Sequence, residues 1–424
     1  MIIKESKSPS YLNAALVVYA VWGFVFSKTV YGATWMVYAS FCIFLFLFGR
    51  QYLKSPKKSD SILRVWTPYI FITVITYLLK GDMEMFAYWI ISYFILSINT
   101  FLSTNQHFPY KTLFYCGIVS LIGIVIQMMI PSFYYSYINS TFIETNSLES
   151  WAEEEYGYAG FTYQLASTAL PIIYASSIVL YASNNLPSFI ARRKVLRYVL
   201  FTILVIGVFL TGKRALSIFV IIAPIIITFL SKKNTAIKIF GLIMFCIVGY
   251  FVLQFFIQNA ANYVHVPLLK RFAESVIESQ MGGDVTSGRV DLYALAIQAF
   301  YDNPILGIGI GNFIPYTKAY TSVHNTYLQV LCEQGIIGFL FFITPIVFCL
   351  QKTIVALRKS INKSNQLKLS LFFQLCFIFY GLTGNVTSGF SSFGIYFLGI
   401  GLLQCYFSND EDITYNTRST SRRC

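Results

Sequence analysis

The stretch YVLFTILVIGVFLTGKRALSIFVIIAPIIITFL, residues 198–230, decides the class of this protein. Its only charges are Lys213 and Arg214, in the segment Thr211-Gly212-Lys213-Arg214 near its middle. A membrane-spanning helix needs roughly 20 apolar residues, so a single helix over the whole stretch would overshoot the bilayer. The stretch therefore predicts two spans, 198–212 and 215–230, that meet at one membrane surface.

The rest of the chain has the same character. Of its 424 residues, 56% are hydrophobic and 12% are charged, whereas soluble proteins carry roughly 25% charged residues. This composition excludes a disordered chain, a collagen-like repeat and a disulfide-rich secreted scaffold. It predicts an all-α polytopic membrane protein, with a single integral membrane domain over residues 1–424. Twelve segments can serve as spans, near 10–27, 32–49, 65–79, 84–102, 112–130, 161–182, 198–212, 215–230, 236–257, 327–350, 369–384 and 390–407.

The basic residues orient these spans. With a cytoplasmic N-terminus, 23 of the 31 Lys and Arg residues fall on the cytoplasmic side, as the positive-inside rule requires. Both termini are then cytoplasmic, and two long loops, 131–160 and 258–326, lie outside. We expect short helices in loop 258–326, together with residues able to carry chemistry. Because the basic residues are scattered over short cytoplasmic segments, they do not indicate a nucleic-acid partner.

The outer loops show no pattern of metal ligands. None of the eight cysteines lies in either long loop, so the sequence predicts neither a disulfide framework nor a thiolate metal site. Acidic residues gather in the stretch 144–155, around Glu153-Glu154-Glu155. They suit a solvated loop face, and a divalent ion is the alternative, although the spacing of these residues is not that of a regular site. The role of this acidic stretch stays open.

The segment Thr211-Gly212-Lys213-Arg214 inverts the charge preference, because it puts two cations at the outer end of two spans. Long basic side chains can reach outward to lipid headgroups, which is the simpler interpretation. Adjacent Lys and Arg side chains beside a glycine can equally form an anion site. Both interpretations stand.

A second cation lies near the start of an expected helix in loop 258–326. Asn303-Pro304 ends the helical pattern, and Thr286 and Ser287 are candidate caps. Arg289 then falls in or next to the first turn, where free N–H groups and the positive helix end suit a phosphate. An ordinary pair with Asp291 or a lipid headgroup is the alternative. The apolar positions predict an amphipathic helix lying against the membrane surface, and they are Val290, Tyr293, Ala294, Ile297 and Tyr301.

The third site is at the start of the predicted span 327–350. His324 precedes this span, and Glu333 lies inside it, where a carboxylate is costly unless it is paired or protonated. A lone histidine at a helix mouth is structural more often than catalytic. Upstream, Gly307-Ile308-Gly309-Ile310-Gly311 lacks the following Lys-Ser/Thr of a phosphate loop. We interpret it as a tight turn that brings His324 back over the membrane.

The stretch from Ser287 to Phe342 contains, in order, Arg, Asn-Pro-x-x-Gly-x-Gly, His-Asn-x-x-Leu-Gln and Glu-x-Gly-x-x-Gly. This order resembles the O-antigen ligase and O-antigen polymerase family of bacterial envelope glycosyltransferases. Thr211-Gly212-Lys213-Arg214 is similar to the family's Thr-Gly-Ser-Arg segment, with Lys213 where Ser is common. Ala159-Gly160-Phe161-Thr162 resembles a family Gly-Phe stretch, but Tyr163-Gln164 replaces the usual Pro-Asn, so no function is assigned to it.

The resemblance implies a glycosyltransferase in the cytoplasmic (inner) membrane, with its active site on the extracytoplasmic face. It would take a glycan from an undecaprenyl-diphosphate carrier. By the same resemblance, Arg214 and Arg289, together with Lys213, would bind the substrate diphosphate, and His324 would be the catalytic residue. The expected reaction is inverting and metal-independent, without a cofactor, because the arginines neutralise the leaving group.

The predicted function is polymerisation of lipid-linked repeat units into O-antigen, a part of lipopolysaccharide, or into capsular polysaccharide. The near alternative is an O-antigen ligase, with lipid A–core as the acceptor. A lipid-linked oligosaccharide flippase is more distant, because the spans carry almost no charge to line a path. Expected partners are the glycan donor, the glycan or lipid A–core acceptor and membrane lipids, with a chain-length regulator and a flippase as candidates.

Overall fold

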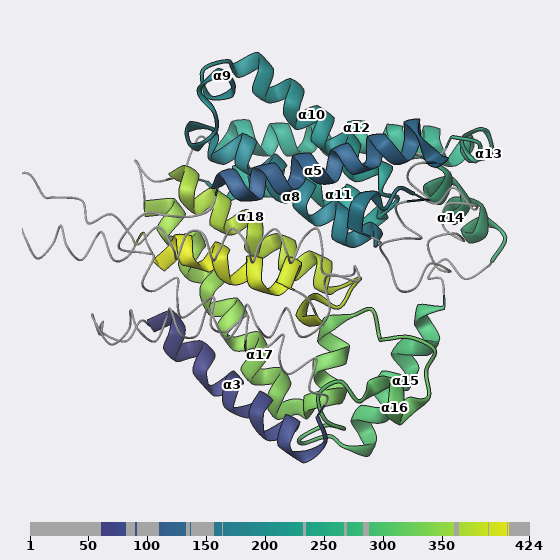
Figure 1. The fold of residues 1–424 in the computed structure, drawn as a ribbon, viewed down its shortest axis with the longest axis vertical. Helices are drawn as coiled ribbons and strands as arrows, with labels where there is room; N and C mark the ends of the chain where they lie inside the picture. Colours follow the sequence, from purple (N-terminus) through teal and green to yellow (C-terminus); the bar gives the residue numbers. More distant parts are fainter. Residues whose placement is uncertain are drawn as a thin grey trace, which may run out of the picture. The chain divides into compact units, whose positions relative to one another are not determined.

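The protein is described here by a computed structural model. The structure describes residues 61–81, 110–132, 157–162, 164–231, 235–266, 269–282, 288–359, 364–388 and 390–404, and single residues 90, 136 and 406. These residues form helices and connecting turns, and no strand occurs among them (Figure 1). The all-α class is therefore confirmed.

Long helices occupy most of the described chain. In order along the sequence they are α3 (Ser61–Lys80), α5 (Tyr110–Met129), α8 (Leu165–Tyr181), α10 (Lys194–Leu210), α11 (Arg214–Leu230), α12 (Thr235–Gln258), α14 (Lys270–Gln280), α15 (Arg289–Asp302), α17 (Thr326–Lys359) and α18 (Ser364–Gly381). Short helical turns connect them, namely η3 (Gly160–Thr162), η4 (Ser183–Asn185), α9 (Ser188–Ala191), α13 (Ala260–Tyr263), α16 (Phe313–Thr317), η5 (Val386–Ser388) and η6 (Phe390–Gly394). An apolar helix, Ser392–Gln404, ends the described part.

Within the described residues, helices lie at nine of the twelve predicted spans. The other three, 10–27, 32–49 and 84–102, lie outside the described residues, apart from residue 90. Among the helices searched, three are long and apolar enough to cross a membrane by length and composition, Ser61–Leu79, Tyr110–Met129 and Thr326–Lys359. The count of twelve spans stays a prediction, as does the location of α13 to α16 in an outer loop.

The described residues divide into two compact units. We call residues 110–291 the α8 unit, and residues 61–90 and 292–406 the α17 unit. The chain passes from the first to the second within α15. This division concerns packing alone, so a single membrane domain over 1–424 stays a prediction.

In the α8 unit, α8 lies between α5 and α10 (Figure 1). Glycines allow this close packing: a Cβ atom on Gly117 would lie 2.4 Å from the Ala175 Cβ, and one on Gly207 would lie 2.6 Å from Leu121 Cδ1. Small residues at helix contacts are typical of membrane bundles. The outward faces of α5 and α10 are apolar, with Ile122 and Ile203 exposed, which suits helices surrounded by lipid.

In the α17 unit, α17 packs along α3 and α18 (Figure 1). Aromatic rings fill the core, and the Phe377 and Tyr396 rings stack with centroids 4.2 Å apart. Trp66 from α3 lies edge-on to Phe342 of α17 and to Phe397 of the last helix. Because large buried rings contribute much of the packing energy of a core, this cluster fixes α17 within its unit.

Candidate functional site

The segment Thr211-Gly212-Lys213-Arg214 forms a tight corner between α10 and α11. Gly212 takes the left-handed conformation, with φ of 65°, which costs a glycine little. Thr211 is buried, and its Oγ1 donates to the Val208 carbonyl at 2.7 Å. Arg214 is the first residue of α11. The predicted break between two helical segments is therefore present, with both cations at the start of the second helix.

The segment 157–162 packs against this corner. The Tyr158 N–H donates to the Leu210 carbonyl at 2.9 Å, and a Cβ atom on Gly157 would lie 2.4 Å from the Thr211 oxygen. The Gly160 N–H donates to the Gln127 Oε1 of α5 at 3.1 Å. Gly157 and Tyr158, directly before the Gly-Phe stretch, thus pack on the corner, a contact that the sequence analysis missed and that the two closely spaced glycines Gly157 and Gly160 could have indicated.

Four cations gather around the corner within the α8 unit. Burial first, and then the like charges of Arg271, Arg289 and Arg214, together lower the pKa of Lys213 to about 8. Lys213 and Arg214 precede the predicted span 215–230, and both are half-buried. The structure therefore brings together the three predicted diphosphate-binding residues, Lys213, Arg214 and Arg289.

The fourth cation, Arg271, was not among the predicted site residues. It is the second residue of α14, and its Nη1 donates to the Gly212 carbonyl at 3.3 Å. Two acids lie on the same helix at positions that share a face with Arg271, namely Glu274 and Glu278. Burial and Arg289 lower the pKa of Arg214, while Glu278 and Glu274 act in the opposite direction. Opposite charges thus reach Arg214 from α14.

His324 lies in the α17 unit, immediately before the N-terminus of α17. Its backbone is left-handed, with φ of 54°, which is uncommon for a residue with a side chain, although histidine adopts it more often than most. The imidazole is half-buried, and its Nε2 lies 3.5 Å from Thr321 Oγ1. Asn325 caps α17, because its Oδ1 accepts from the N–H groups of Tyr327 at 3.0 Å and Leu328 at 3.2 Å.

The helix α17 is interrupted at Gly335, where φ is 66° and ψ is −171°. The glycine loop, residues 303–312, bonds to both sides of this break. On the N-terminal side, the Cys332 carbonyl accepts from Ile308 at 3.0 Å, and the Glu333 carbonyl accepts from Gly309 at 2.9 Å. On the C-terminal side, the Ile336 N–H donates to the Pro304 carbonyl at 2.8 Å. The loop thus satisfies backbone groups that a broken helix would leave without partners.

This arrangement gives the glycine-rich motif a structural role. Gly307, Gly309 and Gly311 all have positive φ values, between 72° and 98°, as the predicted turn requires. A Cβ atom on Gly307 would lie 2.3 Å from the Glu333 carbonyl carbon. The loop therefore does more than turn the chain: its backbone packs directly on the backbone of α17.

Glu333 is buried at the same break, with 3% of its surface exposed. Its Oε1 accepts from the Phe313 N–H at 3.4 Å and from the Gln329 amide at 3.3 Å. A carboxylate inside a span is costly unless it has partners. These two donors are such partners, because hydrogen bonds offset part of the cost of burying the carboxylate. Glu333 thereby links the glycine loop to α17.

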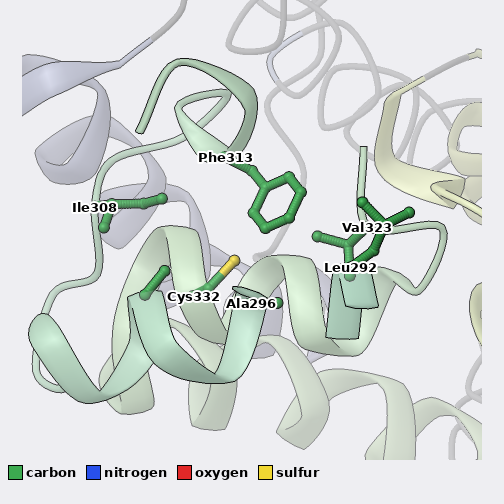
Figure 2. Close-up of a cluster of buried hydrophobic side chains, with 7 residues drawn as sticks. Leu292, Ala296, Ile308, Phe313, Val323 and Cys332 are labelled. Carbon is green, nitrogen blue, oxygen red and sulfur yellow. The ribbon is translucent and has the colours of Figure 1, made fainter. Parts of the chain in front are cut away.

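A hydrophobic cluster supports His324 and the start of α15 (Figure 2). Its buried members are Leu292, Ala296, Ala299, Ile308, Phe313, Val323 and Cys332. Val323, directly before His324, is fully buried in it. The protein covers a different stripe of α15, formed by Leu292, Ala296 and Ala299, while Val290, Ile297 and Tyr301 of the predicted membrane-facing side are exposed. Contact of that exposed face with the membrane surface stays a prediction.

Some predicted site residues belong to different units, and others fall outside the described residues. The three cations belong to the α8 unit and His324 to the α17 unit, so their action on one substrate stays a prediction. Thr286, Ser287, the acidic residues Glu153-Glu154-Glu155 and His107 lie outside the described residues. His265 is exposed after α13. In the part of the chain that is described, no three His, Cys, Asp or Glu side chains are grouped as metal ligands.

The corner between α10 and α11, the start of α15 and the break in α17 are all inside one recognisable domain. Residues 199–343 match the O-antigen ligase family model. The match begins in α10 and ends after Gly335, so it contains Lys213, Arg214, Arg289 and His324. Among curated proteins, no match is found. The resemblance seen in the sequence is confirmed.

The match over residues 199–343 is a similarity to the O-antigen ligase family, and it suggests a glycosyl-transferring enzyme. Together with the apolar helices, it indicates a membrane-embedded protein. Within this match, the α8 unit contains a group of half-buried cations, and the α17 unit contains His324 at the mouth of a helix.

Proposed function

We propose that this protein is a glycosyltransferase that polymerises undecaprenyl-diphosphate-linked repeat units on the outer face of the cytoplasmic membrane. The observation that carries the proposal is the group of cations at the corner of the O-antigen ligase domain, Lys213, Arg214 and Arg289. Cations that are partly removed from water bind a diphosphate far more strongly than exposed ones. A lipid-linked diphosphate is the anionic leaving group of this reaction class.

In the proposed reaction, the acceptor hydroxyl oxygen attacks the anomeric carbon of the donor sugar with inversion. A bond forms between that oxygen and the anomeric carbon, and the bond from the carbon to the diphosphate oxygen breaks. The electron pair leaves with the lipid diphosphate, whose charge Arg214, Arg289 and Lys213 stabilise. The hydroxyl proton passes to His324 as the general base; in the alternative role His324 orients the hydroxyl, and the proton passes to water.

The support for His324 is separate from that for the cations. Its half-buried imidazole follows the fully buried Val323, and the Asn325 cap comes directly after it. A left-handed backbone at a residue other than glycine costs on the order of 1 kcal/mol, so surrounding packing must impose it. This combination favours a side chain held in one orientation, as a catalytic base requires.

The cation group also supports a reaction without a metal ion, since guanidinium and ammonium groups can neutralise a diphosphate as Mg²⁺ does elsewhere. The outer-face location rests on the distribution of basic residues, 23 of 31 on the opposite side. Reporter fusions after Asp284 are expected to report the outer side, and fusions after Asn365 the cytoplasmic side.

The second candidate function is ligation of the glycan to lipid A–core, and the match to the O-antigen ligase model is compatible with both functions. Deletion of the gene, followed by gel analysis of the envelope glycan, separates the two. A single repeat unit on the core indicates a polymerase, and bare core indicates a ligase. A chain-length regulator and a flippase remain proposed partners of the polymerase.

A further inference from the structure

Arg271 joins the corner from a distant part of the chain. Its guanidinium Nη1 donates to the carbonyl of Gly212, the residue that turns the chain just before Lys213. The two residues are 59 positions apart in sequence. An arginine that bonds the backbone of a turn restricts the direction in which the following residue leaves it. Arg271 therefore helps to set the position of Lys213.

The like charges around Lys213 disfavour its ammonium form while no anion is bound. Arg271 from α14, Arg289 from α15 and the neighbouring Arg214 all act on the Lys213 ammonium with the same sign. The acids of α14, Glu274 and Glu278, act on Arg214. The segment 157–162, which packs against the corner from another side, carries one titratable side chain, the Tyr158 phenol.

We propose that Arg271 is a positioning residue of the diphosphate site, which sets Lys213 beside the substrate and makes diphosphate binding depend on the protonation of Lys213. This inference rests on the proposed function. It concerns the pair formed by Arg271 and Lys213. Above about pH 8, binding of the diphosphate is accompanied by uptake of a proton from solvent, which bonds to the Lys213 amine.

The direction of the pH dependence follows from the charges. Without a ligand, burial and the three arginines lower the pKa of Lys213 to about 8. A bound diphosphate raises that pKa, because an opposite charge favours the ammonium form. Binding is therefore independent of pH below about 8. It weakens as the pH rises above that value, because the amine must then take up a proton.

The test measures binding of a synthetic short-chain prenyl diphosphate monosaccharide to the purified full-length protein in detergent, between pH 6.5 and 9.5. Such a diester has no ionisation of its own in this range. We expect wild-type affinity to fall above about pH 8, and the fall to disappear in Lys213→Arg, whose guanidinium stays charged.

Arg271→Met is expected to weaken binding at pH 6.5 roughly tenfold, the effect of losing about one hydrogen bond to a charged group. It should also move the fall in affinity to higher pH, because one like charge beside Lys213 is gone. Arg271→Lys keeps the charge, so we expect the wild-type pH profile with weaker binding. The control is Lys270→Met on the same helix, which should leave affinity and profile unchanged.

Wild-type affinity and pH profile in Arg271→Met would overturn the inference, as would a profile shifted to the same extent in Arg271→Lys. If Arg271→Met does not fold, the pH profile of Arg271→Lys still tests the inference. A wild-type protein that binds no diester at any pH would instead refute the proposed function of the whole site.

Discussion

The corner between α10 and α11 and the break in α17 interrupt apolar helices in different ways. At the corner the chain turns at Gly212 and gathers half-buried cations, and the charges are mostly of one sign. At the break, the glycine loop bonds to the backbone on both sides of Gly335, and a buried carboxylate accepts two further hydrogen bonds. The charges at the corner are mostly of one sign, which suits an anionic ligand. The backbone and carboxylate groups at the break find their hydrogen-bond partners within the protein.

Because of this difference, we expect substitutions at the corner and at the break to have different effects. Changes at the corner should alter anion binding and its pH dependence while the fold persists. Changes at the break should alter the stability of the α17 unit and, through it, the position of His324.

The largest expected effect is loss of glycan transfer in Arg289→Ala and in His324→Ala. The two should differ in binding: Arg289→Ala loses affinity for a diphosphate diester, while His324→Ala retains it, because only Arg289 belongs to the cations around Lys213. Loss of a charged contact of this kind is worth on the order of 2–5 kcal/mol. Arg289→Lys should recover little, since an ammonium lacks the bidentate fork.

Transfer from a synthetic lipid-linked donor, measured at matched protein levels, checks this prediction. His265→Ala, at an exposed histidine, is the control and should remain active. Full activity of His324→Ala would reduce that residue to a structural role, and full activity of both Arg289→Ala and Arg214→Ala would contradict the diphosphate assignment.

Gly307→Ala should cause the largest loss of stability. The new Cβ would lie 2.3 Å from the Glu333 carbonyl carbon, on a backbone with φ of 72°, so both strain and a backbone clash arise. We expect a cost on the order of 3 kcal/mol or more. Gly282→Ala is a matched control, because its φ is 71° but nothing lies within 4 Å of the new atom. It should cost about 1 kcal/mol from strain alone.

Thermal unfolding of the purified variants in detergent compares these two glycines. Equal melting temperatures for Gly307→Ala and Gly282→Ala would show that the glycine loop does not pack on α17 as described.

A smaller effect is expected at the cap of α17. Asn325→Ala removes the acceptor for the Tyr327 and Leu328 N–H groups, which should cost about 1 kcal/mol of stability. Asn325→Asp should restore it, since aspartate is an equally good cap. Because the cap follows His324 directly, transfer should fall with stability in the Ala variant and recover in the Asp variant. Recovery of stability without recovery of transfer would separate the cap from the position of His324.

The smallest expected effect is that of a chelator. If the cations at the corner are sufficient to neutralise the diphosphate, EDTA should leave transfer by the purified enzyme unchanged. The measurement compares transfer rates with and without EDTA, and restoration by added Mg²⁺ or Mn²⁺ after an EDTA-induced loss would contradict the metal-independent mechanism. The acidic stretch around Glu153 would then be the first region to mutate.

The sequence by itself determined the helical class and the break at Thr211–Arg214, and it marked Lys213, Arg214 and Arg289 as basic residues near expected helix ends. Hydropathy and charge are local properties, so a single sequence carries them directly. The end of α15 before Asn303-Pro304 was predictable for the same reason.

Only the tertiary structure decided which distant segments support these residues. The contact of Arg271 with Gly212 joins positions 59 residues apart, and no local pattern specifies such a pairing. The buried face of α15 was not predictable, because apolar residues occur on more than one side of that helix and packing in the Leu292 cluster selects which of them the protein covers. The glycine loop likewise acquires its role from the broken helix that it completes, because a backbone donor is satisfied only by an acceptor that folding brings to it.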